Sequence, residues 1–247
     1  MTGQAGTRSR RLMIPGLAVV LVVIVVLAGV AWHFSSTPSM STGSVATDSS
    51  TTSVNTNSTA STNLAASLLS GTPPTLGSPN ASVTIVEFGD YQCPTCGEWY
   101  RSQETLLIQN LVNTGRVKLV WRDFDYFGPD SVTASVAAYA AGEQGKFWQF
   151  HDLLFQSQQS PNSGWANKQN VRLLAQQLGL NMTAFDQSVN SGRFDSLVNS
   201  NHELGVQAGV SETPTFFLIG PNGKMVTIAG DQPVSVFEQA VASLTSG

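Results

Sequence analysis

The chain has 247 residues, with 12 Lys or Arg and 16 Asp or Glu, so its formal net charge at pH 7 is −4. A net negative charge argues against a nucleic-acid partner, because binding to a polyanion needs a basic surface. Only two cysteines and three histidines are present, which leaves few residue sets that could bind a transition metal.

The first apolar segment is an uncharged run of 21 residues from Leu12 to Trp32. A helix of this length crosses the roughly 30 Å hydrocarbon core of a bilayer. Three arginines precede the run, and no Lys or Arg follows it until Arg101, so the positive-inside rule keeps the N-terminus in the cytoplasm. We therefore expect a cytoplasmic N-terminus over residues 1–11, a single-pass anchor in the cell membrane over residues 12–34, and an extracytoplasmic remainder.

Three other interpretations of this run compete with a membrane anchor. A cleaved signal peptide would have a shorter apolar region of about 7 to 15 residues, although Gly29 and Ala31 could serve as the small residues of a cleavage site. The pair Arg10 and Arg11 also resembles a twin-arginine export signal. A buried core helix is disfavoured, because so long a run has no polar face.

Residues 35–71 are expected to form a flexible linker. Between Ser35 and Asn63, 18 of 29 positions are Ser or Thr and only Asp48 is charged, so the segment lacks the apolar area that it needs to become ordered. The remaining residues, 72–247, are enough for one domain with a hydrophobic core.

The domain shows alternating strand and helix signals, which predict an α/β fold. In chain order we expect a strand over 83–88, a helix beginning near Cys93, a strand over 117–122, several helices between about 130 and 208, strands over 216–219 and 225–229, and a final helix. The helix that begins near Cys93 is expected to bury one apolar face, formed by Tyr100, Leu107, Ile108 and Leu111.

The motif Cys93-Pro94-Thr95-Cys96 follows the first strand, at the expected start of a helix. Two sulfurs three positions apart on a first helical turn can form a Cys93–Cys96 disulfide with little backbone strain, so the pair can cycle between dithiol and disulfide. Cys93 would face unpaired backbone N–H groups and the positive end of the helix dipole, which stabilise a thiolate. Cys93 is therefore expected to be the nucleophile and the shielded Cys96 the resolving cysteine, while Pro94 suits the first helical position.

Two other interpretations of the motif are weaker. Zinc needs four ligands, and with His33 beside the apolar run only His151 and His202 could complete a site. A purely structural disulfide across so small a loop would remove little entropy from the unfolded chain. We therefore expect redox chemistry without a bound metal. His151 follows an aromatic run and fits a core histidine better than a metal ligand.

Glu87 stands in an otherwise apolar strand, six positions before Cys93. A partly buried carboxyl group near Cys96 would have a raised pKa and could take the proton of that thiol, so Glu87 is a candidate proton relay. An equally compatible alternative is a structural ion pair with Lys118 or Arg122.

Four stretches of the domain resemble the DsbA-like thiol-disulfide oxidoreductases, which have a thioredoxin fold. They are residues 87–96, residues 144–152, Gly209-Val210 together with residues 213–216, and the final hairpin and helix. The resemblance covers about residues 72–245. It implies a thioredoxin-like α/β fold split by a helical insertion over about 130–208, and a reaction that needs no metal or organic cofactor.

The same resemblance implies that Thr213-Pro214 is a substrate-binding loop beside the cysteine pair, with a cis peptide bond. A client peptide could pair with its backbone as an added strand. Strong oxidants of this family often carry His between the cysteines, whereas this chain has Pro94-Thr95 as the redox-tuning dipeptide. We therefore expect a potential between those of strong oxidants, about −120 mV, and of thioredoxin, about −270 mV.

These features together predict a membrane-tethered, extracytoplasmic oxidoreductase that forms disulfides in exported proteins. By resemblance, its clients are exported proteins that contain cysteine, and its redox partner is a membrane protein of the DsbB or vitamin K epoxide reductase type. A disulfide reductase of the same fold and a non-catalytic peptide-binding or chaperone module with a structural disulfide remain as alternatives.

Overall fold

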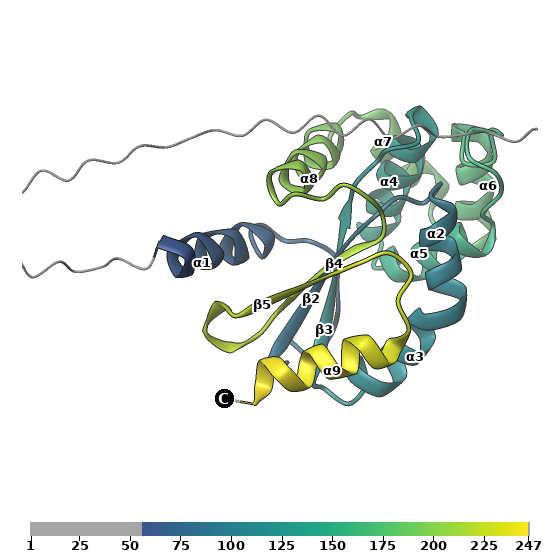
Figure 1. Cartoon of the computed structure of the whole chain (residues 1–247). Coiled ribbons are helices and arrows are strands. Elements are labelled where there is room, and N and C mark those ends of the chain that lie inside the picture. The colour runs from purple at the N-terminus through teal and green to yellow at the C-terminus, as the bar shows by residue number, and fades with distance from the viewer. Residues whose placement is uncertain (1–55, 247) are drawn as a thin grey trace, which may run out of the picture. The chain divides into compact units, whose positions relative to one another are not determined.

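The computed structural model describes residues 56–246. At its centre lies a five-stranded sheet with the strand order β1-β3-β2-β4-β5 (Figure 1). The strands β2 and β3 are parallel, and the other neighbouring pairs are antiparallel. The bounds are β1 (Thr75–Gly77), β2 (Val83–Gly89), β3 (Val117–Asp123), β4 (Thr215–Ile219) and β5 (Met225–Ala229).

Strand β2 occupies the middle of the sheet, and all seven of its residues are buried. Such a strand must be covered on both faces. Because side chains alternate along a strand, Val83 and Ile85 point into one layer of the core, whereas Val86 and Phe88 point into the other. Glu87 shares the face of Ile85, so its carboxyl group is directed into the protein.

Helices cover both faces of the sheet. One face is covered by α9 (Val234–Thr245) and by a continuous helical segment that comprises α2 (Pro94–Trp99), the π-helical η1 (Tyr100–Glu104), α3 (Thr105–Leu107) and the π-helical η2 (Ile108–Val112). The other face is covered by α1 (Thr56–Leu68) and by the end of α8 (Asp195–Gln207). A short 3₁₀ turn, η3 (Pro221–Gly223), joins β4 to β5.

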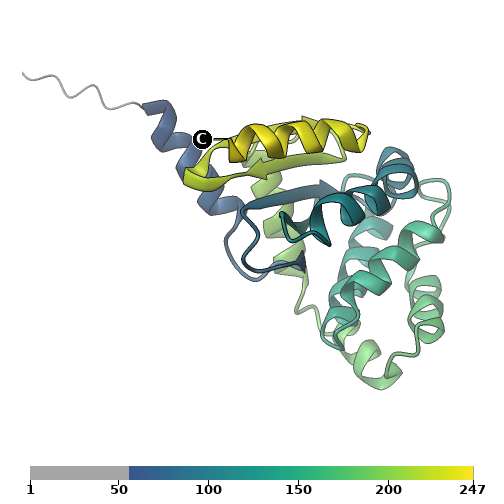
Figure 2. The same ribbon diagram turned by 90° about the horizontal axis from the view of Figure 1, so that it is seen from below.

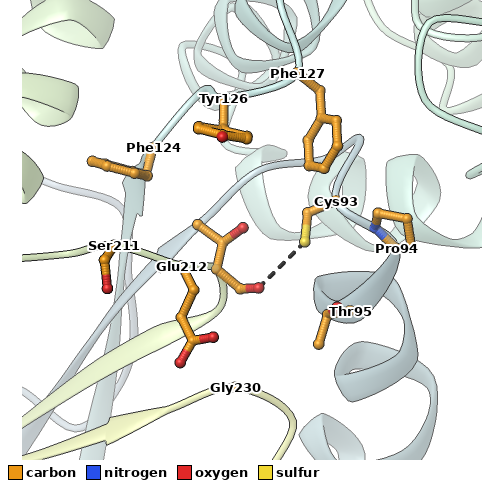
Figure 3. A pocket seen from close by; sticks show the side chains of 10 residues that line it. Cys93, Pro94, Thr95, Phe124, Tyr126, Phe127, Ser211, Glu212 and Gly230 are labelled. Atoms are coloured by element: carbon orange, nitrogen blue, oxygen red, sulfur yellow. Dashed lines mark hydrogen bonds between the residues drawn. The ribbon is translucent and has the colours of Figure 1, made fainter. Parts of the chain in front are cut away.

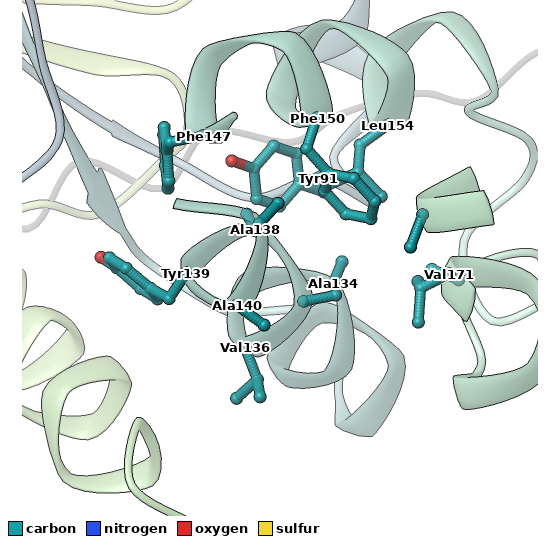
Figure 4. Close-up of a cluster of buried hydrophobic side chains, with 14 of the residues drawn as sticks. Tyr91, Ala134, Val136, Ala138, Tyr139, Ala140, Phe147, Phe150, Leu154 and Val171 are labelled. Carbon is teal, nitrogen blue, oxygen red and sulfur yellow. The ribbon is translucent and has the colours of Figure 1, made fainter. Parts of the chain in front are cut away.

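Five helices are inserted between β3 and β4. They are α4 (Pro129–Gly142), α5 (Phe147–Gln156), α6 (Lys168–Gln177), α7 (Met182–Asn190) and α8 (Asp195–Gln207). Figures 1 and 2 show α4 to α7 gathered beside one end of the sheet. Buried alanines of α4 let the neighbouring helices approach closely, and aromatic side chains fill the space around them (Figure 4). The architecture confirms the thioredoxin-like α/β fold with a helical insertion.

The expectation of a flexible linker over residues 35–71 is wrong for residues 56–68, which form α1. Ala65 and Leu68 are buried against the sheet, so a short apolar face inside a polar sequence was enough to fix this helix. The expected anchor over 12–34 and the linker residues 35–55 lie outside the described residues. Within residues 56–246, no helix combines the length and the apolar character that membrane crossing requires.

Candidate active site

Cys93 is the N-cap residue of α2, and Pro94 starts the helix. The Cys93 Sγ accepts a hydrogen bond from the Cys96 backbone N–H at 3.4 Å and lies 3.3 Å from the Thr213 carbonyl oxygen. A hydrogen bond from the Cys96 thiol, helped by Thr213 and by backbone N–H groups of the first turn, lowers the pKa of Cys93 to about 6, although burial opposes the shift. Cys93 is therefore mainly a thiolate at neutral pH.

Cys96 faces the interior from the same helical turn and is 1% exposed. Burial raises the pKa of its thiol well above the ordinary value, and interactions with Cys93 and Glu87 raise it further. At neutral pH one sulfur of the pair is thus an anion and the other a thiol. Both cysteines are free in the structure, so the Cys93–Cys96 disulfide stays a prediction.

The loop before β4 faces this cysteine pair. Its Thr213–Pro214 peptide bond is cis, as the resemblance implies. The Pro214 carbonyl accepts a hydrogen bond from the Gly230 N–H at 2.8 Å, and Thr215 Oγ1 donates one to the Glu212 carbonyl at 2.7 Å. These two bonds attach the loop to its neighbours and hold it in place opposite the first turn of α2.

A surface pocket of about 270 Å³ opens beside Cys93 (Figure 3). Tyr126, one of its aromatic residues, is 72% exposed. The pocket therefore offers apolar surface next to the reactive sulfur. Its walls are formed by the first turn of α2 with Cys93, which we call the cysteine turn, by the loop after β3 and by the cis-proline loop. The lining residues are Cys93, Pro94, Thr95, Phe124, Tyr126, Phe127, Ser211, Glu212, Thr213 and Gly230.

The buried carboxylate of Asp90 ties the cysteine turn to the pocket wall. Its oxygens accept hydrogen bonds from the backbone N–H groups of Gln92 at 2.7 Å, Tyr126 at 2.7 Å and Phe127 at 3.0 Å. The Asp90 carbonyl also accepts the Cys93 N–H at 3.0 Å. One residue therefore fixes the position of the aromatic wall relative to the reactive sulfur.

A second clamp comes from the insertion. The Gln158 side-chain nitrogen donates hydrogen bonds to the carbonyl oxygens of Tyr91 and Cys93, each at 2.8 Å. Gly97 leaves the room for this contact, because a Cβ atom at that position would lie 1.8 Å from the Gln158 side-chain oxygen. The insertion thus helps to position the first turn of α2.

Glu87 is 2% exposed, and burial, followed by repulsion from Glu104, raises its pKa well above the ordinary value. It pairs in register with Trp121 of β3, so Arg122, the next residue of β3, points to the opposite face of the sheet. No ion pair links Glu87 to Lys118 or Arg122 in the described part of the chain. The structural ion pair considered above is therefore not formed.

Glu104 was not anticipated from the sequence, yet it is only 2% exposed. A signal was present, because Glu104 lies four residues after Tyr100 and three before Leu107, on the predicted apolar face. His151 is a core residue, as expected, and is 1% exposed. Its Nδ1 lies 3.1 Å from the Tyr91 hydroxyl oxygen, and its Nε2 lies 3.6 Å from Glu104 Oε1.

The zinc interpretation of the cysteine pair gains no support from the geometry. Among residues 56–246, no group of three or more Cys, His, Asp or Glu ligand atoms at metal-binding spacing includes a cysteine. His202 instead stacks on Phe124, with ring centroids 4.5 Å apart, and His151 faces Glu104. The sequence-based expectation of a site without a metal stays a prediction.

Comparison with known proteins agrees with this geometry. A family model described as thioredoxin matches residues 69–232, which is more than half of the chain. The disulfide bond formation protein D of Bacillus subtilis is 27% identical over 158 residues, which cover 61% of this chain and 71% of that protein. The Na(+)/H(+) antiporter NhaA 1 of Salinispora arenicola is 32% identical over 146 residues. That match covers 58% of this chain but only 21% of the antiporter.

A solved structure shows the same fold. The chain superposes on alpha-DsbA1 of Wolbachia pipientis with a TM-score of 0.64 and 20% identity, which covers 72% of this chain and 94% of the other. The shared architecture is the thioredoxin-like sheet with its helical insertion. Fold, family model and the relative named for disulfide bond formation all agree with the resemblance stated from the motifs. The chain is therefore a member of the thioredoxin family.

Proposed function

We propose that this protein is an extracytoplasmic dithiol-disulfide oxidoreductase that forms disulfides in exported proteins, with Cys93 and Cys96 as its redox pair. The observation that carries the proposal is the difference between the two sulfurs. The pKa of Cys93 is lowered to about 6, whereas burial raises that of Cys96. A sulfur with a low pKa is a good leaving group and stabilises the reduced enzyme, which favours oxidation of the client.

In the proposed reaction a client thiolate attacks the Cys93 sulfur of the oxidised pair. The Cys93–Cys96 bond breaks, Cys96 keeps the electron pair and takes up a proton, and a mixed disulfide joins Cys93 to the client. A second client thiolate then attacks the client sulfur, and Cys93 leaves as a thiolate. The client loses two electrons and the enzyme gains two.

The Thr213-Pro214 loop is the proposed client-binding element. A client held in extended form would pair with backbone groups of this loop, which lies within contact distance of Cys93. An apolar client side chain next to the reacting cysteine would enter the pocket lined by Tyr126 and Phe127. This arrangement brings the client sulfur to the pocket that Cys93 lines.

Glu87 is the proposed proton carrier for Cys96. Its buried carboxyl group interacts electrostatically with the Cys96 thiol, and burial raises its pKa, which favours the protonated carboxyl group over the carboxylate. Glu87 can therefore donate a proton when Cys96 leaves as a thiolate and accept one when Cys96 attacks.

The proposed location is the outer side of the cell membrane, with residues 12–34 as the anchor and 1–11 in the cytoplasm. No glutathione or thioredoxin pool reduces thiols there, so the oxidised pair can persist. Reoxidation requires an electron acceptor, and by family likeness we propose a membrane protein of the DsbB or vitamin K epoxide reductase type. The reaction itself uses no metal, organic cofactor or nucleic acid.

A second candidate is a disulfide reductase of the same fold. The dipeptide Pro94-Thr95 supports it, because no imidazolium between the cysteines adds to the stability of the thiolate. Trapping the in-cell redox state by alkylation separates the two: the pair should be mostly oxidised in an oxidase and mostly reduced in a reductase. A non-catalytic peptide-binding module would instead keep a disulfide that resists both reductant and alkylation.

The direct test uses the full-length chain with Cys96→Ala. We expect this variant to accumulate mixed disulfides between Cys93 and exported proteins, visible as adducts that a reductant removes. The matched controls are Cys93→Ser and the double variant, which should form none. Adducts on Cys93→Ser but not on Cys96→Ala would reverse the assignment of the nucleophile, and their absence from every variant would contradict the proposed function.

A further inference from the structure

Two buried polar side chains and one half-buried side chain lie close together between η1 and α5. We call Glu104, His151 and Asp152 the rear cluster. His151 Nε2 lies 3.6 Å from Glu104 Oε1, and one ligand atom from each of the three residues lies within 4.8 Å of those of the other two. Glu87 pairs in register with Trp121, whose ring centroid lies 4.8 Å from that of His151. Its carboxyl group also interacts electrostatically with Glu104 and with the Cys96 thiol. Glu87 is therefore the candidate link between the inner sulfur and the rear cluster.

Two atoms of the rear cluster are buried without a hydrogen-bond partner, namely Glu104 Oε1 and His151 Nε2. Glu104 and His151 are 2% and 1% exposed. Burying polar atoms without a partner reduces stability, and apolar residues would pack this space at a lower cost. A pair of such groups facing each other at 3.6 Å is suited to hold and pass a proton.

The proposed reaction creates a need for such a path. Cys96 must gain a proton on each reduction and lose it on each oxidation, yet it is 1% exposed. A client bound to Cys93 would also cover the pocket beside it. Glu87 can exchange one proton with Cys96, but Glu87 is itself 2% exposed. Its proton must therefore be replaced from another direction before the next turnover.

Asp152 provides the outlet. It is half-buried and lines a surface hollow together with Gln149, Leu153, Gln156, Gln177 and Leu178. None of these residues lines the pocket beside Cys93. The path from Glu87 through the rear cluster therefore reaches water at a surface that a client in the pocket beside Cys93 leaves open.

We propose that Glu104, His151 and Asp152 carry protons between Glu87 and solvent, so that Cys96 can change its protonation while a client occupies the pocket. This inference rests on the proposed function. On reduction, the Cys96 thiolate takes the proton of the Glu87 carboxyl group, which regains one from the Glu104–His151 pair, and Asp152 returns one from water. Reoxidation runs each transfer in reverse, so protons balance over a cycle.

Other titratable groups lie beside this path on the neighbouring elements, namely Tyr91 after β2, Cys96 on α2 and Tyr100 on η1. Burial raises the pKa of Tyr100 to about 12 and that of Tyr91 well above its ordinary value. Both tyrosines therefore keep their protons between pH 5 and about pH 9. Within that range, the two tyrosines therefore do not contribute to the pH dependence.

The test measures single-turnover reduction of the oxidised full-length protein, in detergent, between about pH 5 and pH 9. Two thiols are compared: a cysteine-containing peptide that fills the pocket, and 2-mercaptoethanol, which leaves it open. The variants are Glu104→Gln and Asp152→Asn, and Glu143→Gln is the matched control, because Glu143 pairs with Arg193 away from the rear cluster. Circular dichroism and the alkylation midpoint of Cys93 report whether the fold and the nucleophile are unchanged.

We expect both rear-cluster variants to reduce the peptide reaction at least about tenfold, with an altered pH profile and a larger solvent deuterium isotope effect. The loss with 2-mercaptoethanol should be smaller, and Glu143→Gln should match the wild type. Unchanged pH profiles, or an equal loss at every pH and with both thiols, would overturn the relay. If Glu104→Gln does not fold, Asp152→Asn decides alone. A wild-type protein that reacts with neither thiol would instead contradict the proposed function.

Discussion

The close approach of Gly97 to Gln158 predicts opposite effects of Gly97→Ala on stability in two backgrounds. The substitution should lower the free energy of unfolding when Gln158 is present and raise it when Gln158 is replaced by alanine. An added Cβ would lie 1.8 Å from the Gln158 side-chain oxygen and 2.6 Å from its Cδ. The methyl group must therefore displace Gln158, which breaks its hydrogen bonds to the Tyr91 and Cys93 carbonyls, each 2.8 Å long.

The size of the effect follows from these two bonds. Each contributes about 0.5–1.5 kcal/mol, so their loss costs about 1–3 kcal/mol. Replacing a helical glycine by alanine stabilises the helix by about 1 kcal/mol, which offsets part of this loss. Gly97→Ala should therefore lower the free energy of unfolding by up to about 2 kcal/mol. In a Gln158→Ala background only the end of the flexible Arg101 side chain, 2.9 Å from the added Cβ, has to move. The same substitution should then raise the free energy of unfolding by about 1 kcal/mol.

Urea unfolding of the reduced protein measures all four members of this double-mutant cycle. Gly142→Ala is the matched control, because its Cβ would lie 3.4 Å from Phe147, within ordinary contact distance. Its effect should be the same with and without Gln158. If Gly97→Ala changes the stability equally in both backgrounds, the clamp described for Gln158 does not hold the first turn of α2.

Three further predictions concern stability and client binding. Asp125→Asn should raise the thermal unfolding midpoint at pH 7, because burial, followed by Asp123, raises the pKa of Asp125. A carboxyl group with a raised folded pKa stabilises the fold below its unfolded pKa, about 4, and loses this contribution as the pH rises through its folded pKa. The increase in the unfolding midpoint should therefore become smaller toward pH 4. The same increase at every pH would refute this prediction. Gly205→Ala should lower the free energy of unfolding by about 1–3 kcal/mol, because the added Cβ would lie 2.5 Å from the Phe124 ring. Urea unfolding measures this loss, and an unchanged urea midpoint would contradict the contact. Tyr126→Ser should raise KM several-fold for a peptide thiol but not for 2-mercaptoethanol, and equal changes for both would remove Tyr126 from the client site.

The features predictable from the sequence are those set by local interactions. The strand before Cys93 and the helix after it follow from short-range patterns, and the position of Cys93 at the helix start determines which backbone groups its sulfur meets. Glu87 was predictable because a charge interrupts an apolar strand. The position of Thr213-Pro214 came from family resemblance, because Thr213 and Cys93 are 120 positions apart and no local pattern can indicate their contact.

The features missed depend on contacts between distant segments. Asp90 binds backbone N–H groups 36 and 37 residues further along the chain, and nothing near Asp90 in the sequence indicates those partners. The facing pair Glu104 and His151 is likewise formed only when α5 packs against η1. Helix α1 was missed because its composition predicts disorder, and its order comes from burial of Leu68 on the sheet.

The central claim is that the fold makes the two sulfurs chemically different. The most direct measurement is the pH dependence of alkylation of the reduced full-length protein, with each cysteine followed separately by mass spectrometry. Cys93 should react with a midpoint near pH 6. Cys96 should remain unreactive even when the pH rises above the pKa of free cysteine, about 8.5. A midpoint for Cys93 no lower than that of free cysteine, or equal reactivity of the two sulfurs, would contradict the account.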